Sequence, residues 1–212
     1  LDREIHTLYA DSKQCIWTEM PAGFQQSIPS PLRVDTKSRD RTDYVLHPAS
    51  GEQLDDRSAA AVRALRVGHA GRWDVQIVIS DGLNASAIMD PGHLLPYLTA
   101  LRAALAGKGY QAAPEHIVVT AGRVRAGYRI GELLYAGLVP AELPRAVIHV
   151  IGERPGSLHH TFSAYITAPP ASVWSELGKV DHNLTKVVSG IADTALPPAQ
   201  AAAETVLLLE AL

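Results

Sequence analysis

Three short runs of apolar and β-branched residues, each followed directly by a polar loop that contains glycine, constrain the fold of this chain more than any other feature. Taken with their loops, the runs span residues 75–84, 116–124 and 145–156. Runs of this length and composition are typical of buried strands in a parallel sheet. Segments with helical spacing separate them. The sequence therefore predicts an α/β fold class, with a Rossmann-like, mostly parallel sheet flanked by helices.

The helical segments and one further strand complete this prediction. Leucines at intervals of three or four residues predict a helix within residues 91–107. Other predicted helices span residues 54–66, 128–135 and 197–212, and Gly68 with Gly71 is expected to end the first of them. Residues 162–167 alternate in polarity and predict a fourth strand, nearer an edge of the sheet.

Residues 1–52 follow a different pattern. Pro21, Pro29, Pro31 and Pro48 interrupt any long regular element there. We therefore expect residues 1–52 to form an irregular N-terminal extension that docks on a partner, and residues 53–212 to form the Rossmann-like domain. The sequence begins with Leu1, so a processed or partial chain is one expectation.

Composition and charge narrow the class of protein. Hydrophobic residues make up 47% of the chain, which is enough for a sizeable core. The net charge of −3 and the lack of a basic run argue against nucleic acid as a partner. No apolar stretch reaches membrane-spanning length, and no secretory signal opens the chain. The single cysteine, Cys15, fits a reducing compartment, so we expect a cytoplasmic protein.

The three polar loops should meet, because the carboxyl ends of parallel strands lie at one edge of a sheet. None of the loops has the glycine spacing of a dinucleotide or triphosphate site. Asp81 and Glu153 could act as paired carboxylates, but no nucleophile lies between them in the pattern; the alternative for Asp81 is a turn or helix-capping residue. These loops predict a binding edge whose chemistry is supplied elsewhere.

Neither a metal site nor a nucleophile is predicted from spacing. His159 and His160 are adjacent, so they point in different directions on an extended segment, and His182 has no spaced partner. Cys15 lacks the histidine pattern of a catalytic cysteine and is expected to be a structural thiol. The Ser-His-Asp signature G-x-S-x-G is also absent.

Six stretches in order carry a family resemblance. Along the chain they are an S-R-D-x-Y-x-x-P-like region at residues 38–40, 44 and 48–54, a strand with a D-G-L-S-A-like turn at 77–85, G-R-V at 122–124 followed by an I-G-E-L-like segment at 130–134, V-G-E-R-P-G-like residues at 150–156, a C-I-S-N-I-like segment at 187–191, and P-P-x-x-A-A from residue 197. Over residues 38–212 this set resembles the light (small) subunit of ethanolamine ammonia-lyase, an adenosylcobalamin enzyme.

The resemblance implies a division of labour between two chains. A large TIM-barrel subunit would hold the substrate and the chemistry that converts ethanolamine to acetaldehyde and ammonia, and the light subunit would cap the cobalamin without a catalytic residue of its own. The family's cofactor contacts map onto Val124, Glu153 and Val187, and the loop residues Gly122, Arg123, Gly152 and Arg154 complete the predicted site. The resemblance also implies a larger hetero-oligomer, in the cytoplasm or inside a bacterial microcompartment.

The sequence departs from the family pattern in several places. Val187 stands where the family has a cysteine, residues 157–162 differ from the usual loop, residues 138–145 include an insertion, and residues 1–37 match poorly. These departures motivate an alternative, in which the chain is a non-catalytic cobalamin-binding or scaffold homologue. A stand-alone flavodoxin-like oxidoreductase is disfavoured because no phosphate loop is visible.

Overall fold

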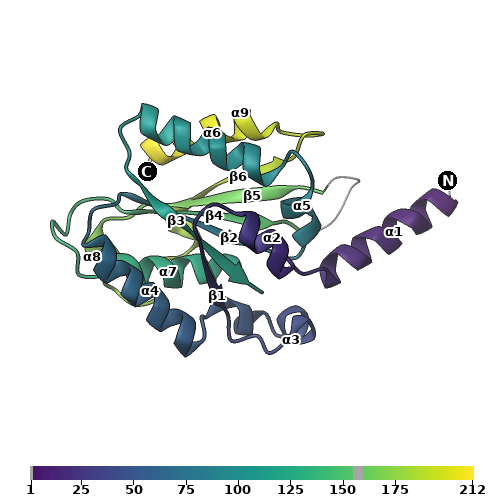
Figure 1. The fold of residues 1–212 in the computed structure, drawn as a ribbon, viewed down its shortest axis with the longest axis horizontal. Coiled ribbons are helices and arrows are strands. Elements are labelled where there is room, and N and C mark those ends of the chain that lie inside the picture. The colour runs from purple at the N-terminus through teal and green to yellow at the C-terminus, as the bar shows by residue number, and fades with distance from the viewer. Residues whose placement is uncertain (1, 155–159) are drawn as a thin grey trace.

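A six-stranded sheet forms the centre of the molecule (Figure 1), which a computed structural model describes for residues 2–154 and 160–212. The strands are β1 Pro31–Asp35, β2 Val75–Ser80, β3 Ala112–Thr120, β4 Ala146–Gly152, β5 Phe162–Thr167 and β6 Thr185–Ile191. They lie in the order β1-β3-β2-β4-β5-β6. The first four are parallel to one another, and β5 and β6 join the sheet in antiparallel register.

Helices cover both faces of the sheet, which explains why every residue of β2 and β4 is buried. Helices α5 Ala85–Met89, α6 Leu94–Gly107 and α9 Pro198–Glu210 pack on one face, and α4 Asp56–His69, α7 Val124–Tyr135 and α8 Ala171–Trp174 lie on the other (Figure 1). Two apolar clusters fill the space between sheet and helices. The predicted α/β class with a mostly parallel, helix-flanked sheet is confirmed.

The N-terminal region consists of short elements of mixed type. It contains α1 Asp2–Trp17, α2 Ala22–Ser27, β1, α3 Arg41–Leu46 and the 3₁₀ turn η1 Pro48–Glu52. Helix α1 contacts α3 and α5 and then projects away from the sheet (Figure 1). Strand β1 pairs with β3, so residues 31–35 of the expected extension form an edge of the main sheet.

Several predicted boundaries were wrong. Strand β5 lies second from one edge of the sheet, between β4 and β6, in agreement with its predicted position nearer an edge. A second 3₁₀ turn, η2 His182–Leu184, leads into β6. The connection from β4 to β5 is too short for a crossover helix, so the pair is antiparallel. Helix α4 continues through Gly68 and ends at Ala70 in the left-handed conformation, and α7 begins at Val124 rather than at Tyr128.

The helices are short. The longest, α1, has 16 residues, while α6 has 14 and α9 has 13. Across the described parts of the chain, none of them has both the length and the apolar character that crossing a membrane requires.

Two helical glycines offer a matched test of the packing between α7 and α8. A Cβ at Gly131 would overlap the ring of Trp174, which is buried and donates from Nε1 to the Arg145 carbonyl over 2.8 Å. A Cβ at Gly68 would meet nothing within 4 Å. We expect Gly131→Ala to lower the free energy of unfolding by about 1–3 kcal/mol because the ring is fixed in place.

Gly68→Ala serves as the control and should raise the free energy of unfolding by about 0.5–1 kcal/mol through helix propensity alone. Urea unfolding of both variants measures the difference. Equal stabilities for the two variants would contradict the tight packing of α7 on Trp174.

Candidate functional site

The loops that follow β2, β3 and β4 meet at one edge of the sheet, as the sequence predicts. The backbone N–H of Leu83 donates to the Gly152 carbonyl over 3.1 Å, which joins the first loop to the third. The N–H of Gly122 donates to Asp81 Oδ1 over 3.3 Å, which joins the second loop to the first. The three loops therefore form one structural unit.

A buried ion pair anchors this unit to the N-terminal region. Arg41 Nη1 lies 3.1 Å from Asp81 Oδ2, and the two side chains are only 7% and 1% exposed. Arg41 also donates from Nη2 to the Gly82 carbonyl and from Nε to the Ile16 carbonyl. Burial raises the pKa of Asp81 to about 6, although Arg41 and two backbone N–H groups favour the carboxylate. Asp81 is thus an anchor, and the helix-capping role in this loop belongs to Asn84.

Tyr44 extends the anchor to the second loop. Its ring lies against the guanidinium groups of Arg41 and Arg123, at 4.6 and 4.2 Å from their Cζ atoms. Its hydroxyl donates to the Gly122 carbonyl over 3.1 Å, and Arg123 Nη2 donates to the Tyr44 carbonyl over 2.8 Å. The guanidinium of Arg123, predicted as part of a cofactor site, is therefore engaged in holding the loop to α3.

The two glycines of the predicted site have a packing role. A Cβ at Gly122 would overlap the Ser80 side chain and lie 2.9 Å from Val119 Cγ1. A Cβ at Gly152 would overlap the backbone of Asn84 and lie 2.5 Å from the Asp81 carbonyl oxygen. The sequence places these glycines in the predicted cofactor site, whereas the space beside each is taken by a neighbouring strand or loop.

A row of side chains across β4, β5 and β6, beside α7, links the three other predicted residues, which are Val124, Glu153 and Val187. His149, Tyr165 and Val187 are neighbours in register on these strands. Tyr165 donates its hydroxyl to Glu153 Oε1 over 3.0 Å, and His149 Nδ1 lies 3.3 Å from the Val124 carbonyl oxygen. The row thus connects Val124, Glu153 and Val187, which are far apart in the sequence.

This row changes from buried to exposed as it crosses the sheet. His149 is 2% exposed, its Nε2 lies 2.6 Å from Ser80 Oγ, and burial lowers its pKa to about 4. Tyr165 and Glu153 are half-buried, and burial raises the pKa of Tyr165 well above its usual range. Val187 is 41% exposed on the edge strand. The row is rigid at its inner end and presents an acceptor and an apolar side chain at its outer end.

Arg154 is exposed, and the remaining residues of the G-E-R-P-G loop, 155–156, lie outside the described residues.

Sequence reasoning also missed four residues that build the edge: Arg41, Tyr44, His149 and Tyr165. A signal existed for His149, because a histidine inside an otherwise apolar buried strand must have a hydrogen-bond partner.

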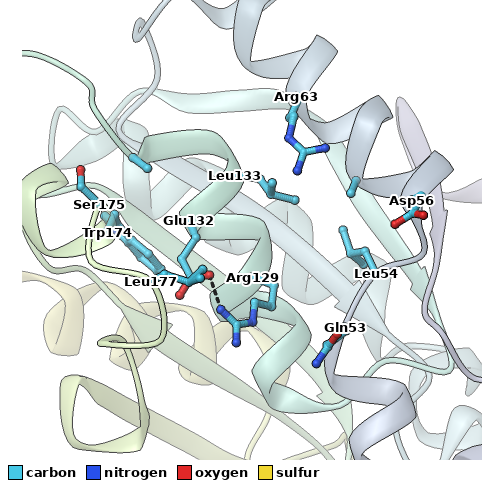
Figure 2. Close-up of a pocket in the computed structure, with 12 residues that line it drawn as sticks. Gln53, Leu54, Asp56, Arg63, Arg129, Glu132, Leu133, Trp174, Ser175 and Leu177 are labelled. Atoms are coloured by element: carbon cyan, nitrogen blue, oxygen red, sulfur yellow. Dashed lines mark hydrogen bonds and ion pairs between the residues drawn. The ribbon is translucent and has the colours of Figure 1, made fainter.

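A cavity of about 440 Å³ lies elsewhere, between α4, α7 and α8 (Figure 2). Figure 2 shows Arg63 from α4 and Arg129 from α7 on facing walls. Arg129 is paired with Glu132 at 2.6 Å, and Glu132 also accepts from the Gly178 N–H. None of the sequence-predicted site residues lines this cavity.

Comparison with known proteins agrees with the resemblance. The family described as Ethanolamine ammonia-lyase light chain (EutC) matches residues 3–212. An ethanolamine ammonia-lyase small subunit from Pseudomonas fluorescens (strain Pf0-1) is 37% identical over 140 residues, which are 66% of this chain and 47% of the relative. The small subunit from Pseudomonas paraeruginosa (strain PA7) is 34% identical over 149 residues, 70% of this chain and 50% of the relative. The chain spans about half the length of the curated relatives it matches.

The buried ion pair gives a second test. We expect Arg41→Ala to lower the free energy of unfolding by about 3–5 kcal/mol, because it leaves the Asp81 carboxylate buried without its counter-charge. Arg39→Ala is the control, since the Arg39 side chain is 81% exposed in its pair with Asp43 and should cost less than about 1 kcal/mol. Denaturant unfolding of both variants measures this, and a small effect at Arg41 would remove its role as anchor.

The buried histidine predicts a pH dependence of stability. Because the pKa of His149 is lowered to about 4, the unfolded chain binds a proton there at a higher pH than the folded chain does. The contribution of this histidine to stability should therefore fall as the pH drops from about 6.5 towards 4. Between pH 7 and pH 5 this histidine should account for a loss of about 2 kcal/mol.

Asp81 acts in the opposite direction, because its pKa is raised and the folded chain binds its proton first. Comparison with His149→Gln isolates the histidine, since both proteins keep Asp81. From pH 7 to pH 5 the free energy of unfolding should therefore fall by about 2 kcal/mol more in the parent chain than in His149→Gln. The same acid sensitivity in both would show that His149 is not the group responsible.

Proposed function

Since the chain belongs to the ethanolamine ammonia-lyase light-chain family, we propose that it is the light subunit of an adenosylcobalamin-dependent ethanolamine ammonia-lyase, which converts ethanolamine to acetaldehyde and ammonia. A large TIM-barrel subunit would hold the substrate, and this chain would complete the cobalamin site. The observation that carries the proposal is the row from His149 to Val187, which links Val124, Glu153 and Val187 beside α7.

The chemistry of these residues fits cobalamin. A corrin ring offers an apolar face and a rim of amide groups. Glu153 is a half-buried carboxylate with one oxygen already fixed by Tyr165, so its remaining acceptor capacity suits amide N–H groups. Val187 is an exposed apolar side chain on the adjacent edge strand. An acceptor and an apolar contact held on a rigid sheet support binding at this face.

Each residue of the row has a defined part in the proposal. Tyr165 holds the Glu153 carboxylate in place, and His149, neutral and bonded to Ser80, fixes the start of α7 at Val124. The loops are held in their packed positions by Gly122, Arg123 and Gly152. Arg154, which is exposed, is proposed to contact the cofactor. Adenosylcobalamin supplies the radical through homolysis of its cobalt–carbon bond.

The N-terminal region has a place in the same proposal. Within residues 1–52, the part proposed to act as a docking arm is α1, which projects from the body with Tyr9 and Trp17 exposed at 73% and 45%, while β1 and Arg41 hold the later part to the sheet. The partner proposed for this arm is the large subunit, with further assembly into a hetero-oligomer in the cytoplasm or in a bacterial microcompartment.

Retention of the cofactor by the complex tests the proposal. The chain is co-purified with its candidate large subunit, adenosylcobalamin is added, and the visible absorbance of the corrin is measured after desalting. We expect retention only when both chains are present. Glu153→Ala should weaken cobalamin binding about tenfold or more, because a hydrogen bond to a charged group is worth about 1.5–3 kcal/mol.

Glu142→Ala is the matched control, since Glu142 is an exposed carboxylate near the opposite end of β4 and should leave retention unchanged. Tyr165→Phe should weaken retention less than Glu153→Ala, because it frees the carboxylate without removing it. An intact complex that retains no corrin would instead favour the non-catalytic scaffold alternative, which the exposed valine at 187 motivates.

A further inference from the structure

A second cluster of side chains lies where α1 meets the segment before β5, away from the row on the sheet. Asp11 and Cys15 are four residues apart on α1 and so share one face of the helix. His160 approaches them from the segment that leads into β5. One ligand atom from each of the three residues lies within 4.8 Å of the other two.

The distances in this cluster match a tetrahedral metal. Zinc bonds of about 2.3 Å to sulfur and about 2.0–2.2 Å to nitrogen or oxygen place sulfur and nitrogen ligands about 3.6 Å apart and nitrogen and oxygen ligands about 3.4 Å apart. In the structure, Cys15 Sγ lies 3.4 Å from His160 Nε2, and Asp11 Oδ2 lies 3.2 Å from the same nitrogen. A single histidine nitrogen is therefore shared by a thiol and a carboxylate.

The other nitrogen of the imidazole is also held. His160 Nδ1 lies 2.9 Å from Asp90 Oδ2, just after the end of α5. A carboxylate on the far nitrogen fixes the tautomer and the ring orientation of metal-binding histidines. Cys15 is 2% exposed while the Asp11 side chain is 56% exposed, so the cluster has a buried floor and an open rim through which an ion can enter.

We propose that Asp11, Cys15 and His160 form a Zn²⁺ site, with water as the fourth ligand and Asp90 as the residue that positions the imidazole. Binding removes the proton of the Cys15 thiol, which passes to solvent, and the ligating imidazole is neutral. The ion would fasten α1 to the segment before β5. This inference is independent of the proposed cofactor site, because it needs neither cobalamin nor a partner chain.

The rival is a cluster without metal. A protonated His160 can donate to both Asp11 and Asp90, and these two carboxylates raise its pKa. Burial and Asp11 raise the pKa of the Cys15 thiol, so without an ion the thiol keeps its proton. The two alternatives differ in what happens when a divalent ion is added.

The test is titration of the full 212-residue chain, freed of metal, with Co²⁺ followed by displacement with Zn²⁺. Thiolate ligation produces a charge-transfer band in the near ultraviolet and the intense visible bands of tetrahedral Co²⁺. We expect one Co²⁺ per chain, proton release on binding, and loss of the bands when Zn²⁺ is added. Asp90→Asn should weaken binding about 10–100-fold while keeping the bands, because it changes only the support of the histidine.

Cys15→Ser should remove the charge-transfer band, and His160→Gln should weaken binding by a similar or larger factor than Asp90→Asn. Exposed His47, paired with Asp43 on α3, provides the control, and His47→Gln should bind as the parent chain does. Circular dichroism checks that each variant is folded. A folded parent chain that gives no charge-transfer band, or a band that persists in Cys15→Ser, would overturn the site and leave a hydrogen-bonded cluster only.

Discussion

The buried pair of Arg41 and Asp81 is the interaction on which the carboxyl edge of the sheet depends. Asp81 directly follows β2 and accepts the N–H of Gly122 from the loop after β3, while Arg41 comes from the N-terminal region and also binds two backbone carbonyls. A carboxylate at 1% exposure is stable only with such partners. The pair therefore fixes the N-terminal region and the loops relative to one another.

In the candidate site, the residues that hold the loops in place are different from the residues proposed to contact the cofactor. The side chains that hold the edge, such as Tyr44 and Arg123, are occupied by one another, and His149 is occupied by Ser80. Glu153 and Val187 remain at the accessible end of the row. We propose that this surface completes a site whose chemistry resides on a partner chain, as the proposed function requires.

The proposed zinc site and the proposed cofactor surface are connected through the chain that leaves β4. Glu153 lies at the start of this connection and His160 near its end. An ion at His160 would restrain the end of this connection by fixing it to α1. The two sites can nevertheless be tested separately, since one is read from Co²⁺ spectra of the chain alone and the other from corrin retained by a complex.

Local sequence determined the core strands, the main helices and the shared loop edge, because the apolar pattern that predicts them is a property of neighbouring residues. The family followed from short motifs in the same order along the chain. It did not determine that β1 joins the sheet or that β5 and β6 run antiparallel, since strand direction depends on pairing partners distant in sequence. Only the tertiary structure decided that Arg41 meets Asp81 and that Cys15 meets His160, 145 residues away. The spacing of ligand residues along the chain does not reveal such contacts, because folding rather than sequence proximity brings these groups together.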